Sequence, residues 1–230
     1  YALCDFTQAL ENVNQAIGMT RDNGEYQITL AKICRAQKRY DDALRAIDIA
    51  IDKSPDNQSA KSEKGLILYS LGRYEEASTI FGEQIMDNPD SPMNYLLRGW
   101  VMDEGMDKHG DAITLYKRMA GLGTDNSKPS SLHGFALLFS GKKAEAVKWA
   151  DDIVRDNNDT DGSINYMAAC LYAQAEESGK AFQCLETALN KGYANRYNIT
   201  MNDDARVNIA PIRKGTALTT LLSNYSYIFE

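Results

Sequence analysis

The sequence predicts an all-α chain, an α-solenoid of antiparallel helix pairs that ends in a helical cap. Three observations lead to this prediction. Six of the 26 alanines fall on a grid of 34 or 35 residues, a small residue recurs twelve or thirteen residues before most of them, and the period stops near residue 195. Repeats of this length bury their apolar faces only against their neighbours. The alanine column is Ala9, Ala43, Ala77, Ala112, Ala146 and Ala181, and the small-residue column is Ala31, Gly65, Gly99, Gly134 and Ala168.

Each unit is expected to contain two helices. The first carries the small residue, where a neighbouring helix must approach closely, and the second carries the alanine, with apolar residues three or four positions apart. A short turn such as Leu71–Arg73 joins them, and Gly72 and Gly141 are typical helix ends. Pro55 and Pro89, each followed by Asp, close two units one period apart. Since no stretch alternates apolar and polar residues, the sequence predicts no strand.

These columns give the expected elements in order. Residues 1–23 form a partial repeat that starts late in a first helix, so we expect an upstream half-repeat. Five complete units follow, with the third and fifth carrying one extra residue in the turn before Ala112 and Ala181. The expected units are 24–57, 58–91, 92–126, 127–160 and 161–195, within one domain that covers residues 1–230.

The second unit resembles the tetratricopeptide repeat through its residues Gly65, Gly72, Tyr74, Ala77, Phe81 and Pro89. The first unit matches nearly as well, through Ala31, Tyr40, Ala43, Ile47, Ala50 and Pro55. The resemblance extends over residues 1–195 and is most specific over 24–91, because the later units lack the closing proline. It implies a right-handed superhelix whose first helices line a concave groove, and a role in protein–protein interaction. It also favours a bacterial protein.

The last segment, 196–230, breaks the period and is expected to form a helical cap. The last repeat would otherwise expose its apolar face. The run Ile209–Arg213, followed by Leu218, Leu221 and Leu222, is similar to the segment that closes many bacterial arrays. The apolar end Tyr225–Phe229 either packs back on this cap or contacts a second chain, so self-association stays open.

Composition excludes several classes of partner. The net charge of -7, from 25 basic and 32 acidic residues, disfavours nucleic acid, which needs a basic surface. No apolar run is long enough to cross a membrane. Cys4, Cys34, Cys170 and Cys184 form no C-x-x-C pair and are interpreted as buried helix residues. Unpaired cysteines favour the cytoplasm. A periplasmic location remains the alternative if a signal peptide precedes Tyr1.

The sequence contains no recognisable catalytic set, so we expect no enzyme activity and no cofactor. Its two histidines, His109 and His133, have no evident nucleophile or acid beside them, and His109 takes the place of a packing aromatic residue in the turn. The segment Gly121–Lys128 lacks the Gly-Lys-Ser/Thr ending of a phosphate-binding loop.

Residues 157–168 resemble a calcium-binding loop in their spacing. Asn157, Asp159 and Asp161 are placed like the first ligands, and Gly162 supplies the turn. However, Ala168 stands where a bidentate Glu is needed, and the segment lies between two units, where Asp and Asn are common as turn and cap residues. We therefore predict no metal site.

Seven side chains are predicted to lie on or near the groove and to contact a partner. Aromatic residues recur across successive first helices and would anchor an apolar segment, while two basic residues would orient it. A core position for some of these rings is an equally good interpretation, because aromatic residues at helical spacing commonly pack between helices. The predicted set is Lys32, Arg35, Tyr69, Trp100, Phe135, Phe139 and Tyr172.

The predicted function is a non-enzymatic interaction or scaffold module that binds a protein or peptide. The family's two-carboxylate clamp needs Lys and Asn at set places on the first helices, where this chain carries residues such as Ser62, Glu63 and Leu66. Recognition is therefore expected to be apolar or aromatic. The alternative is a regulatory segment of a longer protein whose catalytic domain lies upstream of residue 1.

Overall fold

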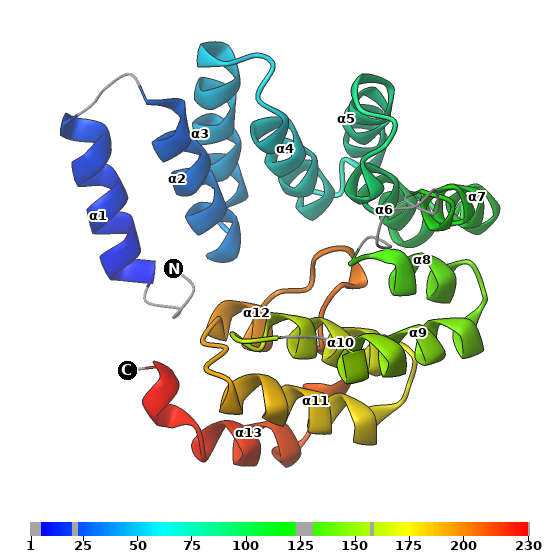
Figure 1. Cartoon of the computed structure of the whole chain (residues 1–230). Helices are drawn as coiled ribbons and strands as arrows, with labels where there is room; N and C mark the ends of the chain where they lie inside the picture. Colours follow the sequence, from blue (N-terminus) through cyan, green and yellow to red (C-terminus); the bar gives the residue numbers. More distant parts are fainter. Residues whose placement is uncertain (1–5, 20–22, 123–130, 157–158, 230) are drawn as a thin grey trace. The chain divides into compact units, whose positions relative to one another are not determined.

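A computed structural model describes residues 6–19, 23–122, 131–156 and 159–229, and every regular element within them is helical. The all-α fold of antiparallel helix pairs is thus confirmed (Figure 1). Cys4, Asn157 and most of the segment Gly121–Lys128 lie outside the described residues. The helices are α1 (Phe6–Met19), α2 (Gly24–Ala36), α3 (Tyr40–Lys53), α4 (Gln58–Ser70), α5 (Tyr74–Asp87), α6 (Pro92–Trp100), α7 (His109–Ala120), α8 (His133–Phe139), α9 (Lys143–Asp156), α10 (Ser163–Gln174), α11 (Ser178–Asn190), α12 (Arg196–Thr200) and α13 (Thr216–Ser223).

Backbone contacts divide the chain into two compact units, which we describe separately. Unit 1 runs to Ala112 and unit 2 begins at Ile113, so the boundary falls inside α7. In unit 1, α2 packs on α3, α4 on α5, and α5 on α6. In unit 2, α8 packs on α9 and α10 on α11. The first and second helices of four predicted pairs, α2/α3, α4/α5, α8/α9 and α10/α11, are therefore neighbours in space.

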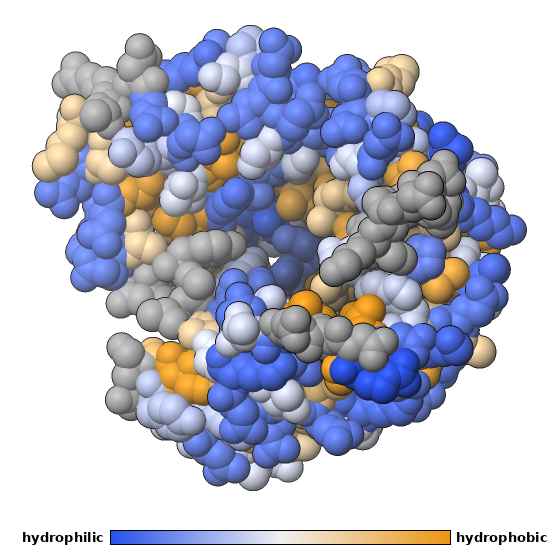
Figure 2. Space-filling model, viewed as in Figure 1, coloured by the Kyte–Doolittle hydropathy of each residue, from blue (hydrophilic) through white to orange (hydrophobic). Residues whose placement is uncertain are grey.

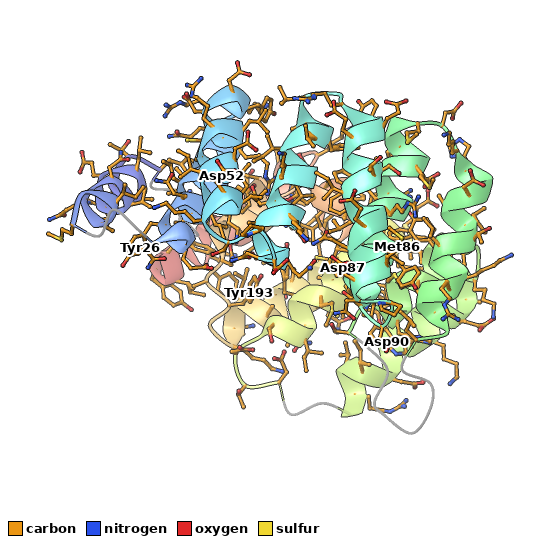
Figure 3. The ribbon with its side chains drawn as sticks, turned by 90° about the horizontal axis from the view of Figure 1, so that it is seen from above. Tyr26, Asp52, Met86, Asp87, Asp90 and Tyr193 are labelled. Carbon is orange, nitrogen blue, oxygen red and sulfur yellow. The ribbon has the colours of Figure 1, made fainter. Side chains whose placement is uncertain are left out.

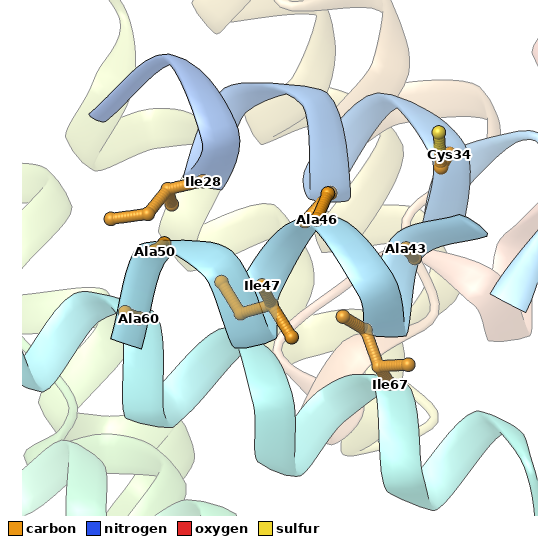
Figure 4. Close-up of a cluster of buried hydrophobic side chains, with 9 residues drawn as sticks. Ile28, Cys34, Ala43, Ala46, Ile47, Ala50, Ala60 and Ile67 are labelled. Atoms are coloured by element: carbon orange, nitrogen blue, oxygen red, sulfur yellow. The ribbon is translucent and has the colours of Figure 1, made fainter. Parts of the chain in front are cut away.

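The alanine column lies where two helices of a pair cross. Ala43, Ala77, Ala112, Ala146 and Ala181 are all fully buried. In the first complete pair, Ile28, Ala43, Ile47 and Ile67 belong to one cluster that joins α2, α3 and α4 (Figure 4). A small side chain at the crossing brings the backbones close together, and the isoleucines fill the space on either side.

Hydrogen bonds at the helix ends explain where the elements start and stop. The side chains of Asn23 and Asn57 accept backbone N–H groups at the starts of α2 and α4. In each of the five complete repeats, the first helix is followed by a residue with positive φ, which closes the last turn. These residues are Lys38, Gly72, Asp107, Gly141 and Glu176. Every one of them stands five residues before the buried alanine. The predicted helix ends at Gly72 and Gly141 are confirmed.

This constant spacing corrects the prediction of extra residues in the third and fifth turns. In the third unit the extra residue lies at the end of the first helix, where Val101–Gly105 forms a π-turn (η1) and the Lys108 N–H donates to the carbonyl of Met102. In the fifth unit, the Glu177 N–H donates to the Tyr172 carbonyl, as the Arg39 N–H does to Cys34. The small residue equivalent to Ala31 is therefore Ala169, one position later than predicted.

The C-terminal segment of unit 2 continues after α11 through α12 and three short 3-10 turns, η2 (Asp204–Arg206), η3 (Ala210–Ile212) and η4 (Ser226–Phe229), with α13 between the last two. Ile199, Ile209 and Ile212 are buried, and η3 packs on α10 and α11. The Tyr225 hydroxyl donates to the Asn190 side chain at 2.9 Å. Within unit 2, part of the apolar end therefore packs back on the preceding repeat.

Candidate functional site

The surface formed by α2, α4 and α6 of unit 1 carries four of the predicted binding residues. Lys32 and Arg35 lie on α2, Tyr69 on α4 and Trp100 on α6. Counted from the small residue of each helix, Lys32 and Trp100 are one position later, and Arg35 and Tyr69 are four positions later. We call this the unit 1 first-helix surface.

Arg35 is held in an ion pair between two first helices. Its Nε lies 2.6 Å from Glu63 Oε1 on α4, and the side chains of both residues are more than nine-tenths buried. The pair joins α2 to α4, so the guanidinium of Arg35 serves the packing of adjacent repeats. In the sequence, Glu63 stands in the stretch that lacks the residues of the carboxylate clamp, and nothing there marks it as the partner of Arg35.

Three aromatic rings form a cluster at the α4, α5 and α6 end of this surface. The centroids of the Tyr69 and Trp100 rings are 3.8 Å apart, and those of Tyr69 and Tyr74 are 5.2 Å apart. Trp100 is buried, with 5% of its surface exposed, whereas Tyr69 is half-buried. Trp100 therefore supports Tyr69 from below, and Tyr69 presents the accessible ring.

The π-turn Val101–Gly105 borders this cluster. Tyr74 packs against Gly105, where an added Cβ would lie 2.6 Å from Cδ1 of the ring. The turn also aligns Asp103, whose Oδ1 lies 2.6 Å from Nδ1 of His109. π-turns are rare and are found frequently at functional sites. Here the turn packs on the Tyr74 ring through Gly105 and carries two acidic residues, Asp103 and Glu104.

His109 is an exposed residue at the start of α7 and not the packing residue that the sequence predicted. Its ring contacts the carboxylates of Asp103 and Asp107, at 2.6 and 2.8 Å. The hydrogen bond to Asp103 is the main cause that raises the pKa of His109. His133 differs, because burial lowers the pKa of its ring. Neither histidine has a nucleophile arranged beside it among the contacts that the structure describes.

The three predicted residues of unit 2 lie in or under packed structure. Phe135 is fully buried and Tyr172 is 2% exposed. The Tyr172 carbonyl accepts the hydrogen bond that closes the first helix of its repeat, as the carbonyls of Cys34 and Leu68 do in theirs. Tyr172 therefore occupies the same repeat position as Cys34 and Leu68, which are both core residues. Phe139 is half-buried, and the guanidinium of Arg206 lies 4.5 Å from its ring centroid. The choice between core and groove that the sequence left open is thus resolved toward the core for Trp100, Phe135 and Tyr172. Their role in partner binding stays a prediction.

A polar pocket that the sequence did not predict lies between α9, α10 and α11. The Tyr172 hydroxyl donates to Asp151 Oδ1 at 2.7 Å, and Lys180 Nζ lies 2.6 Å from the same oxygen. These two hydrogen bonds lower the pKa of Asp151, and burial together with the carboxylate raises that of Tyr172. Since Tyr172, Asp151 and Lys180 satisfy one another, we interpret the pocket as a joint between repeats.

The described part of the former calcium-loop candidate acts as a helix cap. Asp159 Oδ2 accepts the N–H of Asn165 at 3.0 Å, and Asp161 Oδ1 accepts that of Ser163 at 3.0 Å. Gly162 has φ +78, and an added Cβ would lie 2.4 Å from the Ala188 carbonyl oxygen. Within the described ranges, no group of three or more His, Cys, Asp or Glu side chains is arranged to hold a metal ion.

The cysteines, the absence of a membrane-spanning helix within the described ranges, and the character of the surface complete the description. Cys34, Cys170 and Cys184 are free and buried, and burial raises the pKa of the Cys184 thiol to about 11. No helix within the described ranges has the length and apolar content needed for a bilayer span. The face shown in Figure 2 is mostly hydrophilic, with hydrophobic side chains in separate areas.

Exposed carboxylates lie where the second helices of unit 1 end. Asp52 lies near the C-terminal end of α3. Asp87 is the last residue of α5, Asp90 follows the helix, and Met86 precedes Asp87 (Figure 3). Lys61 Nζ is 3.5 Å from Asp87 Oδ2. Met86 is 76% exposed and lies on a second helix, which makes it a useful control for the first-helix surface.

A family model matches the part of the chain that contains the first two complete repeats. Residues 28–91 match the model of the tetratricopeptide repeat family. Over 193 residues, 82% of this chain, the sequence is 26% identical to the BBSome complex member BBS4 of Bos taurus, and the match covers 36% of that protein. Over 71 residues, 31% of this chain, it is 34% identical to the uncharacterized protein y4yS of Sinorhizobium fredii, covering 39% of that protein. The chain thus matches little more than a third of each relative's length.

Two solved structures are also similar. YrrB, described as a TPR protein with an unusual peptide-binding site, aligns with a TM-score of 0.44 and 19% identity, over 80% of this chain and 93% of that chain. A tetratricopeptide repeat protein of Parabacteroides merdae aligns with a TM-score of 0.47 and 13% identity, over 96% of this chain and 93% of that chain.

Proposed function

Because the chain is a tetratricopeptide repeat protein, we propose that it is a non-enzymatic module that holds a protein or peptide partner on the unit 1 first-helix surface. The observation that carries this proposal is the close, tilted packing of the Tyr69 and Trp100 rings, with a centroid distance of 3.8 Å. A partly accessible ring on a buried one is rigid, so it loses little conformational entropy on binding. Such aromatic anchors dominate many protein interfaces.

The charges on this surface would give the partner a direction. Lys32 on α2 lies at one end of the row of first helices, and Asp103 and Glu104 follow α6 at the other. The partner segment we expect is apolar or aromatic at its centre, acidic where it meets α2 and basic where it meets the π-turn. Arg35 supports the surface from within, since Glu63 neutralises it.

The hypothesis that this chain is a regulatory segment of a longer enzyme is not favoured by any of these findings. Self-association through the C-terminal residues stays a separate prediction. Phe135, Phe139 and Tyr172 keep their place as predicted groove residues of unit 2, but Phe135 and Tyr172 are buried and the Phe139 ring is contacted by Arg206, which makes them poor anchors compared with Tyr69.

Selection from a displayed random peptide library with the purified chain tests the proposal. Peptides that bind the wild-type chain are remeasured with Tyr69→Ala and with the control Met86→Ala, after circular dichroism has confirmed that both variants are folded. We expect Tyr69→Ala to weaken binding at least about tenfold, as truncating an interface anchor does, while Met86→Ala leaves it unchanged. Equal binding to both variants would refute this surface.

A reversal of Lys32 tests the proposed direction. Lys32→Glu is expected to weaken peptides with an acidic residue on the α2 side and to leave neutral peptides unchanged. The effect should shrink as salt is added, because exposed charges are screened. An equal loss for acidic and neutral peptides would contradict the orienting role.

A further inference from the structure

The C-terminal segment of unit 2 crosses two first helices at equivalent positions. Phe139 and Gln174 each stand five residues after the small residue of their helix, Gly134 and Ala169. Both are contacted by the same short stretch. The Arg206 guanidinium lies 4.5 Å from the centroid of Phe139, and Gln174 Nε2 donates to the carbonyl and the side-chain oxygen of Asn208, at 3.1 and 3.2 Å.

These contacts have the character of peptide recognition. An arginine over an aromatic face gains from the attraction between its charge and the ring. Arg206 also donates to the Tyr116 hydroxyl on α7 at 3.4 Å, and the rings of Tyr116 and Phe139 are 5.3 Å apart. An amide side chain that donates to a backbone carbonyl and to a side-chain oxygen of one residue fixes the register of a bound segment. Arg206 and Asn208, which are two residues apart, thus contact two successive first helices, α8 and α10.

The backbone of this stretch is strained. Ala205 and Arg206 both have positive φ, +51 and +57. For residues with a Cβ, the left-handed region is sterically unfavourable. Two such residues in a row bring Arg206 over Phe139, so the contacts offset a conformation that the free segment would avoid.

We propose that residues 203–213 are an internal ligand, which occupies a peptide-binding site made of Tyr116, Phe139 and Gln174. The site recognises a segment in which an arginine is followed two residues later by an asparagine, in the turned conformation that Asp204–Arg206 adopts. An external segment with the same spacing competes with the internal ligand for this site. This goes beyond the proposed function, which concerns unit 1 and does not depend on it.

The main test uses the full chain and a labelled synthetic peptide of residues 203–214 as the probe, with binding followed by fluorescence anisotropy. In the wild-type chain the internal ligand competes from a high local concentration and keeps the apparent affinity low. The double substitution Arg206→Ala, Asn208→Ala removes contacts of the internal ligand and so weakens its competition with the probe. We expect the probe to bind this variant at least about tenfold more tightly than the wild-type chain.

Four controls define the result. Lys214 is exposed and directly follows the internal ligand, so Lys214→Ala is expected to bind the probe like the wild-type chain. Adding Gln174→Ala to the loosened variant should abolish the gain, and a probe with alanine in place of both recognition residues should not bind. Tyr69→Ala should leave probe binding unchanged, which separates this proposal from the proposed function.

Hydrogen exchange of the wild-type chain provides a second test that needs no variant. Saturating probe should increase exchange of the backbone amides in residues 203–213, since the internal ligand is displaced, while the alanine-substituted probe should not. Unchanged exchange at saturation would overturn the proposal. So would a folded Arg206→Ala, Asn208→Ala chain that binds the probe no better than the wild-type chain, because the segment would then be a permanent part of the cap.

Discussion

Gly65 is the position where the repeat pattern makes its sharpest energetic prediction. A Cβ added at this residue of α4 would lie 2.4 Å from Cζ and 2.8 Å from Cε1 of Phe81 on α5. Phe81 is fully buried, so its ring cannot move aside without displacing other core atoms. Overpacking of this kind costs about 1–3 kcal/mol, while the change from glycine to alanine inside a helix returns about 1 kcal/mol. Because the clash is with a fully buried ring, the overpacking cost is expected in the upper part of that range, about 2–3 kcal/mol, so Gly65→Ala should lose about 1–2 kcal/mol of unfolding free energy.

Guanidinium unfolding followed by circular dichroism measures this loss. Gly179→Ala is the matched control, because Gly179 lies in α11 with no atom within 4 Å of an added Cβ, and it should be neutral or slightly stabilising. Phe81→Leu removes the contacting ring atoms, so Gly65→Ala should cost less in that background than in the wild-type chain. If Gly65→Ala is as stable as the wild-type chain, or costs the same in both backgrounds, close approach of α4 and α5 is not the reason for glycine here.

Three further outcomes follow from charges and burial. Arg35→Met should destabilise the chain by about 3 kcal/mol because it leaves the carboxylate of Glu63 buried and unpaired, and Arg35→Met with Glu63→Leu should recover most of the loss, whereas Arg73→Met in an exposed pair should change little. In an NMR titration of the two histidines, His109 should titrate above the ordinary pKa of 6.5 and His133 below it. The contribution of His109 to stability is therefore complete below pH 6.5 and is lost as the pH rises through the pKa of His109 in the folded chain. The contribution of His133 is present above pH 6.5 and is lost as the pH falls through the pKa of His133 in the folded chain. A single titration midpoint shared by the two histidines would contradict both environments. Cys184, with a pKa of about 11, should react with a thiol reagent at pH 8 far more slowly in the native chain than in urea, and equal rates would show that the thiol is not buried.

The helix pairs could be predicted from the sequence because their determinants are local and periodic. Alanine at the crossing, a small residue on the first helix and a helix-ending glycine each act within one repeat. The exact register of the fifth unit could not, since Ala168 and Ala169 are both small and only the hydrogen bond from Glu177 to Tyr172 distinguishes them. That one-residue difference moves Tyr172 from the predicted groove to a core position.

The candidate site was predicted less completely, because exposure depends on contacts between residues far apart in sequence. Periodicity places Tyr69 and Trp100 on first helices, but only the structure shows that one ring covers the other. Likewise, an isolated Glu63 gives no sign that it neutralises Arg35 across 28 positions. The π-turn was visible as one extra residue before Ala112, but its location within the first helix is set by the hydrogen bonds of Met106 and Lys108.

One register position explains why the C-terminal segment of unit 2 departs from the repeat. Five residues after the small residue, α2 and α4 of unit 1 carry Ala36 and Ser70, whereas α8 and α10 of unit 2 carry Phe139 and Gln174. Small side chains at this position need no cover, but a phenylalanine ring and an amide do, because exposed apolar surface and unsatisfied polar groups both cost free energy. A further helix pair would present the wrong groups to them. An irregular segment with Arg206 and Asn208 two residues apart satisfies both, so the period ends where the chain must supply a ligand for its own helices.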